Sequence, residues 1–393
     1  MTSRDQLLAR LAAREPLRGL DLAGLDLRGL DLREADLSGA DLTRAILDGV
    51  DLSRAILARA TLAAARLPGA RLDGAVLDGA NLREARFDGA SLDGAVLKRA
   101  AAEGAVFQAC SLAKADLSGA SLTGAWFGEA GLAGATAEGA TAGGASFARA
   151  QLRDVVFDGV DLGEADLREV DLAGATLAGC ALAGASLAGA SLEGADLDGA
   201  DLTEVGTEGA SFVRASLVGA KLAGKDLRGC ALVDVDLSEA DLTGADLSAC
   251  DALRGTFARA RLDGARLLRL RARHGDFTGA SLARADLRDA DLREACFEGA
   301  AAAGSRWDLA RVARGRFARA ELRGATLAGC DARWASLAHA DLRDADLSGA
   351  RLDGADAHRA ALTGASLAGA SLAHVGGTDP RRAAAEDFAA GGR

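Results

Sequence analysis

The chain is short of several residue types: its 393 residues include no tyrosine, three prolines, three tryptophans and 11 phenylalanines. So few aromatic residues argue against two or three ordinary globular domains and favour a repeat architecture. No run of 18 apolar residues is present, which argues against a membrane-spanning helix. Residues 1–16 lack the apolar core of a secretory signal, so we expect a cytoplasmic protein with no membrane partner.

What the chain does contain is a period of five residues. From Leu17 to Leu372 a core residue occupies 72 consecutive sites of this spacing without an insertion or deletion. Leucine fills 51 of these sites and phenylalanine 10, and alanine predominates two residues before each of them. Together with 49% hydrophobic residues, this pattern is typical of a folded repeat protein rather than a disordered chain.

Neither a long helix nor a long strand explains this period. Five residues turn the face of an α-helix by about 140°, and an odd repeat reverses the face of a strand each time. A coil with five-residue sides fits, because the alanine and leucine sites of each side then point inward and the next two residues turn the corner. Glycine is frequent at the second of these corner positions, as in Gly24, Gly29 and Gly39.

The repeats resemble those of a known family. The run Ala35-Asp36-Leu37-Ser38-Gly39 matches the A-(D/N)-L-x-x consensus of pentapeptide-repeat proteins. The resemblance covers residues 17–375 and implies an all-β fold, a right-handed quadrilateral β-helix with four repeats per coil. The chain would then have about 18 coils and a length of roughly 85 Å at the usual strand spacing.

A coil of four repeats makes side chains at positions i and i+20 stack on one another. Phenylalanines follow this spacing in two series, which we expect to form ladders on opposite faces of the core. Small residues precede the bulky ones, since Ala102 comes before Phe107 and Ala272 before Phe277. The predicted ladders are Phe87, Phe107, Phe127 and Phe147, and Phe257, Phe277, Phe297 and Phe317.

The two ends of such a coil need covers, because an open end exposes core side chains and unpaired backbone. We expect residues 1–16 to form an N-terminal capping helix, since Ser3 and Gln6 make a capping box and Pro16 ends the segment. Residues 17–375 form the single β-helix, and residues 376–393 form a C-terminal tail with a short helix beginning near Pro380. Some relatives dimerise through a C-terminal element, so a homodimer stays open.

Enzymatic chemistry is not favoured. The four histidines, His274, His339, His358 and His374, fall at corner positions and are expected to be exposed and far apart. No nucleotide-binding or zinc-protease motif is found, so we predict no catalytic residue, cofactor or metal ligand. The cysteines mostly replace alanine at inward sites and are predicted to be small buried apolar residues: Cys110, Cys180, Cys230, Cys250 and Cys330.

The distribution of charge is the feature most informative about function. The net charge is −11, and residues 151–250 carry 19 acidic and six basic side chains. Residues 251–320 reverse the sign with 15 basic and nine acidic side chains. The candidate acidic partner surface is Asp161, Glu164, Asp201, Glu204 and Asp241. The candidate basic belt is Arg261, Arg266, Arg271, Arg306, Arg311 and Arg316.

Lys225 breaks the pattern, because it occupies an inward alanine-type site where an unpaired ammonium would be costly. We expect it to reach solvent, Asp226 or a carboxylate of a neighbouring coil. A local distortion there is a hypothesis that would make the coils near residues 205–230 a contact point.

These features predict a non-enzymatic rod that presents a charged surface to a protein partner. The resemblance suggests a more specific alternative, since some pentapeptide-repeat proteins mimic DNA, bind DNA gyrase or topoisomerase IV and protect them from poisons. A second alternative is an accessory role in a bacterial secretion system. Direct binding of nucleic acid is not favoured, because interleaved aspartates neutralise the basic belt.

Overall fold

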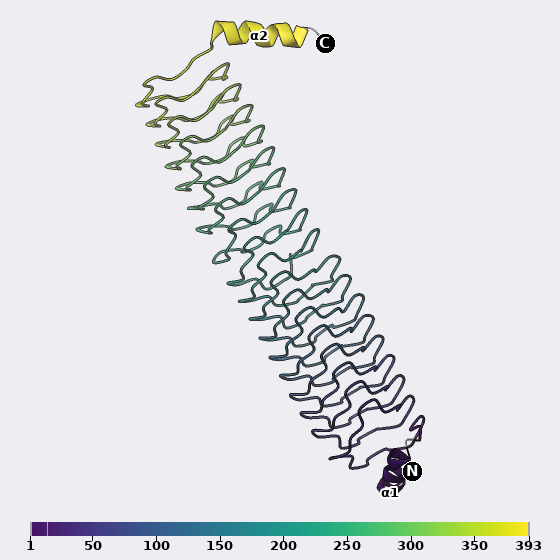
Figure 1. Cartoon of the computed structure of the whole chain (residues 1–393). Helices are drawn as coiled ribbons and strands as arrows, with labels where there is room; N and C mark the ends of the chain where they lie inside the picture. Colours follow the sequence, from purple (N-terminus) through teal and green to yellow (C-terminus); the bar gives the residue numbers. More distant parts are fainter. Residues whose placement is uncertain (1, 14, 392–393) are drawn as a thin grey trace. The chain divides into compact units, whose positions relative to one another are not determined.

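The computed structural model describes residues 2–13 and 15–391, and the chain divides into two compact units, Met1–Ala210 and Ser211–Arg393. Helix α1 (Arg4–Ala12) begins the first unit and helix α2 (Pro380–Gly391) ends the second (Figure 1). Between the helices, the β-structure of each unit consists of short parallel bridges rather than long strands.

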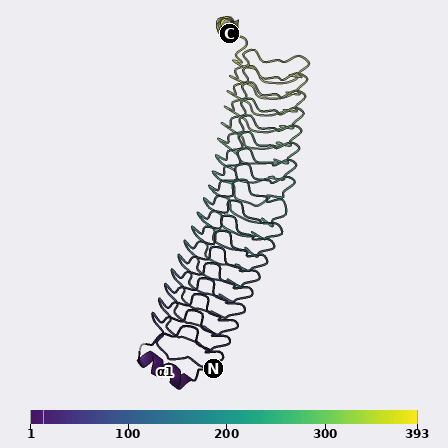
Figure 2. The same ribbon diagram turned by 90° about the vertical axis from the view of Figure 1, so that its right-hand side faces the viewer.

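The bridges of both units join residues that are 20 positions apart. In the first unit Asp21 pairs with Asp41 and Asp41 with Thr61, and in the second Arg261 pairs with Ser281. The amide of Leu22 donates to the carbonyl of Asp41 at 2.7 Å, and the amide of Asp41 donates to the carbonyl of Leu20 at 2.8 Å. One coil therefore comprises four pentapeptides, and successive coils stack within each unit (Figure 2).

Each coil turns a corner after every fifth residue. The second corner residue has a positive φ, which glycine adopts without strain, as Gly39 does with φ of 65°. Other residues occupy the same position at a cost of about 1 kcal/mol, for example Arg44 with φ of 56°. A long side chain at such a corner lies over the glycine of the next coil, as Arg54 does over Gly74.

The leucine and alanine sites fill the interior of each unit. Leu42 and Ala40 are fully buried, and so are nearly all residues at equivalent sites up to Ala355. The two phenylalanine series stack one ring per coil: the centroids of Phe87 and Phe107 lie 4.9 Å apart, and those of Phe257 and Phe277 lie 4.6 Å apart. Neighbouring rings are nearly parallel, so each series forms a continuous ladder along its unit.

The two helices end their units differently. In α1 the side chains of Ser3 and Gln6 make the predicted capping box, and Leu7 is fully buried. In the second unit Leu362 and Leu372 of the last coil remain 39% and 47% exposed. Helix α2 therefore leaves these leucines uncovered and does not act as the cover that the sequence predicts.

Lys225 does not disturb the backbone. Its side chain is half-buried, its amide donates to the carbonyl of Leu222 at 3.1 Å, and its carbonyl accepts from Asp246 at 2.8 Å. These are the regular bonds of the coil, so the backbone at Lys225 shows no distortion.

Candidate protein-binding surfaces

The aspartates that open each side of a coil stabilise the turn that follows them. Asp161 Oδ1 accepts the amide of Gly163 at 3.0 Å, and Asp201 Oδ1 accepts the amide of Thr203 at 3.2 Å. This arrangement is an Asx turn, in which one carboxylate oxygen accepts a hydrogen bond from the backbone of the turn. Asparagine can make the same bond, so charge and turn can be separated by substitution.

Residues 151–210, here called the acidic coils, lie wholly in the first unit. They carry 13 acidic and two basic side chains, and both basic ones are paired: Arg153 with Asp171 at 3.1 Å and Arg168 with Asp166 at 2.8 Å. The predicted surface residues Asp161, Glu164, Asp201 and Glu204 are exposed on these coils. A net charge of −11 on so short a segment creates a strong negative potential.

Asp241 is placed differently from the other four residues of the predicted acidic surface. It lies in the second unit, where its Oδ2 contacts Arg261 Nη1 at 3.2 Å and its Oδ1 accepts from Thr243. The hydrogen bond from Thr243 outweighs desolvation and lowers the pKa of this carboxyl, with a further contribution from Arg261. Because its charge is largely compensated, Asp241 adds little to an acidic surface.

Most arginines of the basic belt contact carboxylates of a neighbouring coil. Arg271 contacts Asp251 at 3.0 Å, and Arg311 contacts Asp291 at 3.6 Å. Arg261, Arg266 and Arg316 have partners of the same kind, Asp241, Asp246 and Glu298. These surface pairs contribute little to stability but reduce the field of the belt.

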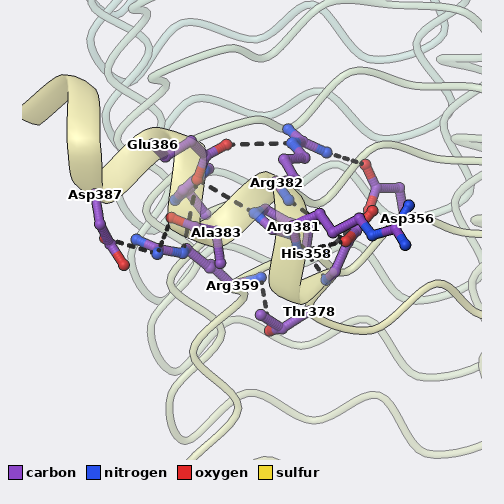
Figure 3. A network of polar contacts seen from close by, with 11 residues as sticks. Asp356, His358, Arg359, Thr378, Arg381, Arg382, Ala383, Glu386 and Asp387 are labelled. Carbon is purple, nitrogen blue, oxygen red and sulfur yellow. Dashed lines mark hydrogen bonds and ion pairs between the residues drawn. The ribbon is translucent and has the colours of Figure 1, made fainter.

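A polar cluster attaches α2 to the last coils of the second unit. The Nε2 atoms of His339 and His358 each lie 3.2 Å from Oε2 of Glu386. Arg382 donates to the other oxygen of Glu386 at 3.2 Å, and Arg359 donates to Asp387 at 2.7 Å (Figure 3). We call this cluster the α2 clasp.

The α2 clasp corrects the prediction for the histidines. His358 is 1% exposed, and its ring lies 5.4 Å from that of His339, so these two are neither exposed nor distant. The amide of Asp379 donates to His358 Nδ1 at 3.1 Å, which requires the proton of the neutral ring to lie on Nε2 and point at Glu386. Desolvation opposes ionisation of Glu386, but the bonds from His358 and His339 lower its pKa to about 2.

Three residues of the α2 clasp, His339, His358 and Glu386, also have side chains that can bind a metal ion, and their ligand atoms lie within 4.8 Å of one another. Two histidines and a glutamate match the ligands of many zinc sites. Here, however, His358 Nε2 carries a proton, and both oxygens of Glu386 already face arginines, Arg359 at 3.6 Å and Arg382 at 3.2 Å. The arrangement therefore serves as a hydrogen-bonded attachment of the helix.

The structure buries most of the cysteines, as expected for small apolar residues. Cys110, Cys230, Cys250 and Cys330 are buried, and Cys180 and Cys296 are partly buried. Burial raises the pKa of Cys110 and of Cys330 to about 12, so both thiols stay protonated at neutral pH. A protonated buried thiol is a poor nucleophile.

The fold and its surfaces define a β-helical repeat protein with charged outward faces and a helix clasped to one end. Comparison with known families assigns it further: the chain belongs to the pentapeptide-repeat family, whose members form right-handed β-helices. The family description "Pentapeptide repeats (8 copies)" matches residues 17–54, 55–94, 90–127, 130–168, 165–203, 210–248, 240–278, 273–305, 316–354 and 340–375.

Several solved structures are similar to the chain. HetL, a pentapeptide-repeat protein involved in heterocyst differentiation regulation from Nostoc sp. strain PCC 7120, is 22% identical, with 95% of this chain and 96% of HetL covered and a TM-score of 0.22. QnrB1, a plasmid-mediated fluoroquinolone resistance protein, is 20% identical, with 52% and 97% covered and a TM-score of 0.21. Family membership rests on the repeat match, not on these alignments.

Neither the curated sequences nor the two helices add to this assignment. A comparison with curated protein sequences finds no match. Within the described part of the chain, neither helix has the length and apolar character needed to cross a bilayer.

Proposed function

We propose that this chain is a non-enzymatic binding protein that presents the acidic coils to a basic surface of a protein partner. The supporting observation is the charge of these coils, whose two arginines are already paired within the same segment. Such a surface attracts a basic partner over several ångströms and accelerates its association at low salt. Its position on stacked coils also supports binding, because a rigid surface loses little conformational entropy when a partner docks.

The nucleophilic and titratable groups of the chain favour binding over catalysis. The buried cysteines are held protonated, and the clasp histidines are occupied by Glu386. The aspartates of the acidic coils spend one oxygen on their own turns, as in Asp161 and Asp201. This use of each group leaves surface charge as the main chemical property available to a partner.

A matched pair of proteins tests the binding role. One is the natural chain, and the other carries Asp161→Asn, Glu164→Gln, Asp201→Asn and Glu204→Gln. The asparagines keep the turn bonds, so the variant should retain its circular dichroism and melting temperature. We expect the natural chain to retain basic proteins that elute with salt, and the variant to lose them. Equal retention by both proteins would refute the acidic coils as the binding surface.

The specific candidate partner is DNA gyrase or topoisomerase IV. Support comes from the family resemblance, in which some members imitate DNA, and from the net negative charge of the coils. Three coils span about 14 Å, or roughly four base pairs, so the contact would be shorter than a full DNA segment. A supercoiling assay with and without a fluoroquinolone, at two salt concentrations, tests this candidate. Inhibition or drug protection that is lost in the neutral variant supports it, and no effect at micromolar protein refutes it.

The remaining expectations belong to the same proposal. A cytoplasmic location agrees with the free cysteines. An accessory role in a secretion system is the second candidate function, and secretion genes beside the coding sequence would favour it over a role with topoisomerases.

A further inference from the structure

Two large apolar side chains in the second unit lie at corner positions where the coil needs no large apolar residue. Leu309 and Trp334 are 63% and 64% exposed, more than any other large apolar residue in the described part of the chain. Both are corner residues with positive φ, 62° and 61°. Every other described corner residue with positive φ is glycine, alanine, histidine or a charged residue. Large exposed side chains in a disfavoured backbone region indicate a role outside folding.

The coil register places both residues along one face. A column of bridges runs through Arg271, Asp291, Arg311, Asp331 and Arg351. Leu309 is the corner residue just before Arg311 of this column. Trp334 is the corner residue just after Asp331, which belongs to the same column one coil further on. Because the bridge between Arg311 and Asp331 joins these coils, the two apolar side chains border the same face. We call it the Leu309–Trp334 face.

The Leu309–Trp334 face has more arginines than carboxylates to pair with them. Asp291 is shared between Arg293 at 2.5 Å and Arg311 at 3.6 Å. Glu294 lies near Arg314, and Asp331 and Asp353 lie near Arg351, but in the described chain neither arginine makes an ion pair within 4 Å, and both lie beside Trp334 in the register. The face therefore combines two apolar anchors with incompletely compensated positive charge, a combination typical of protein interfaces.

The acidic coils of the first unit have the complementary pattern. Their coil register places Asp161 and Glu164 in one coil and Asp201 and Glu204 two coils further on. The equivalent positions of the coil between them carry the exposed small residues Ala181, Ala183 and Gly184. The side chain of Glu164 leans over Gly184, so the exposed small side chains between the carboxylates are those of Ala181 and Ala183, against which a leucine or an indole can pack.

We propose that the Leu309–Trp334 face of one molecule docks on the acidic coils of a second copy of this chain. The arginines then meet the carboxylates, and the two apolar side chains lie on Ala181 and Ala183. This proposal rests on the proposed function, in which the acidic coils are a binding surface, and it names a second copy of the chain as their partner. The second copy then competes with any other partner for the acidic coils. Because the charges are exposed, the contact weakens as salt shortens the screening length from about 10 Å at 0.1 M.

Sedimentation velocity of the full chain tests the contact without any other partner. We expect association at about 50 μM protein and low salt, and at least tenfold weaker association in 0.5 M salt. Leu309→Gly with Trp334→Gly should abolish it while keeping the melting temperature, because glycine suits the positive φ. The control, Leu362→Ala with Leu372→Ala, alters the open end of the last coil and should leave association unchanged. A monomer under all conditions, or loss of association only in the control, would overturn the proposal.

A charge exchange identifies the two surfaces. Arg314→Glu with Arg351→Glu should abolish self-association, and so should Glu164→Arg with Glu204→Arg, whose glutamates make no Asx turn. An equimolar mixture of the two variants should associate again, because each supplies the charge that the other needs. Failure of the mixture to associate would refute the pairing of these faces. The outcome of the supercoiling assay is independent of this result, so the two proposals fail separately.

Discussion

The indole of Trp334 lies over Gly354, its counterpart one coil further along, so closely that a Cβ atom on Gly354 would collide with the ring. Leu309 lies over Gly329 and Arg259 lies over Gly279 in the same way but less closely, since a Cβ atom would be 3.0 Å from Leu309 and 3.6 Å from Arg259. A long corner side chain leans along the stack, and a glycine in the next coil leaves room for it. Glycine at a corner thus serves two purposes, positive φ and close approach.

This relationship predicts that Gly354→Ala is more harmful than the same change at another glycine corner. At Gly354 the new methyl group must displace the indole of Trp334. The alanine must also keep the backbone φ of 71°, which residues with a side chain disfavour. We expect a loss of about 2 kcal/mol in the free energy of unfolding, measured with urea. Gly349→Ala, where the nearest atom is a backbone nitrogen 4.0 Å away, should lose only about 1 kcal/mol.

The double variant Gly354→Ala with Trp334→Gly provides the control. Removing the indole removes the collision, so the double variant should be more stable than Gly354→Ala alone. Equal losses at Gly349 and Gly354 would show that the contact with Trp334 has no energetic effect.

The repeat itself made much of the core predictable. A five-residue period, with phenylalanine recurring at every fourth repeat, specifies which side chains stack, and Phe87 and Phe107 do so. The period says nothing of segments outside it, so it could not place Glu386 of α2. The period could, however, have predicted that His339 and His358 lie close together. Position 359 stacks on His339 in the next coil, and His358 comes one position before it, so the two histidines are neighbours in adjacent coils.

The sequence left open whether Lys225 distorts its coil, and the structure shows that its backbone keeps its regular bonds. The placement of the C-terminal helix was predicted wrongly. The C-terminal helix was expected to cover the last coil, but its polar contacts hold it to His339, His358 and Arg359 instead. Where a helix docks depends on side-chain contacts that the repeat does not encode.

Ser305 and Trp307 are predicted to be energetically coupled. Trp307 Nε1 donates to Ser305 Oγ at 2.6 Å, Ser305 donates to the carbonyl of Ala302, and both side chains are fully buried. Ser305→Ala leaves the indole N–H without this acceptor and should destabilise the chain by about 1–3 kcal/mol. After Trp307→Phe the same substitution should cost much less, and a double-mutant cycle by urea unfolding measures the difference. Strictly additive losses would contradict the coupling.

Asp341 and Arg343 predict a pH dependence of stability. Two hydrogen bonds from Arg343 outweigh desolvation and lower the pKa of Asp341 to about 2. A lowered pKa in the folded state stabilises the chain above the unfolded value of about 4, and this contribution is lost as pH falls from 4 to 2. Asp341→Asn should therefore lower the melting temperature at pH 6 but not at pH 2. In an Arg343→Gln background, Asp341→Asn should no longer lower the melting temperature at pH 6. If Asp341→Asn lowers the melting temperature as much at pH 2 as at pH 6, the lowered pKa of Asp341 does not stabilise the fold.

The α2 clasp predicts that His358 controls whether α2 stays attached. His358 is the buried link of the cluster: it accepts from Asp379 at the start of the helix and faces Glu386 in its second half. His358→Ala removes both contacts and leaves Glu386 held by the more exposed His339 and two arginines. Hydrogen exchange of amides 383–387 should then accelerate at least tenfold, while exchange in the coils before residue 337 stays the same. His374→Ala, which changes an exposed histidine outside the clasp, should leave exchange in α2 unaltered, and equal acceleration in both variants would show that the clasp does not hold the helix.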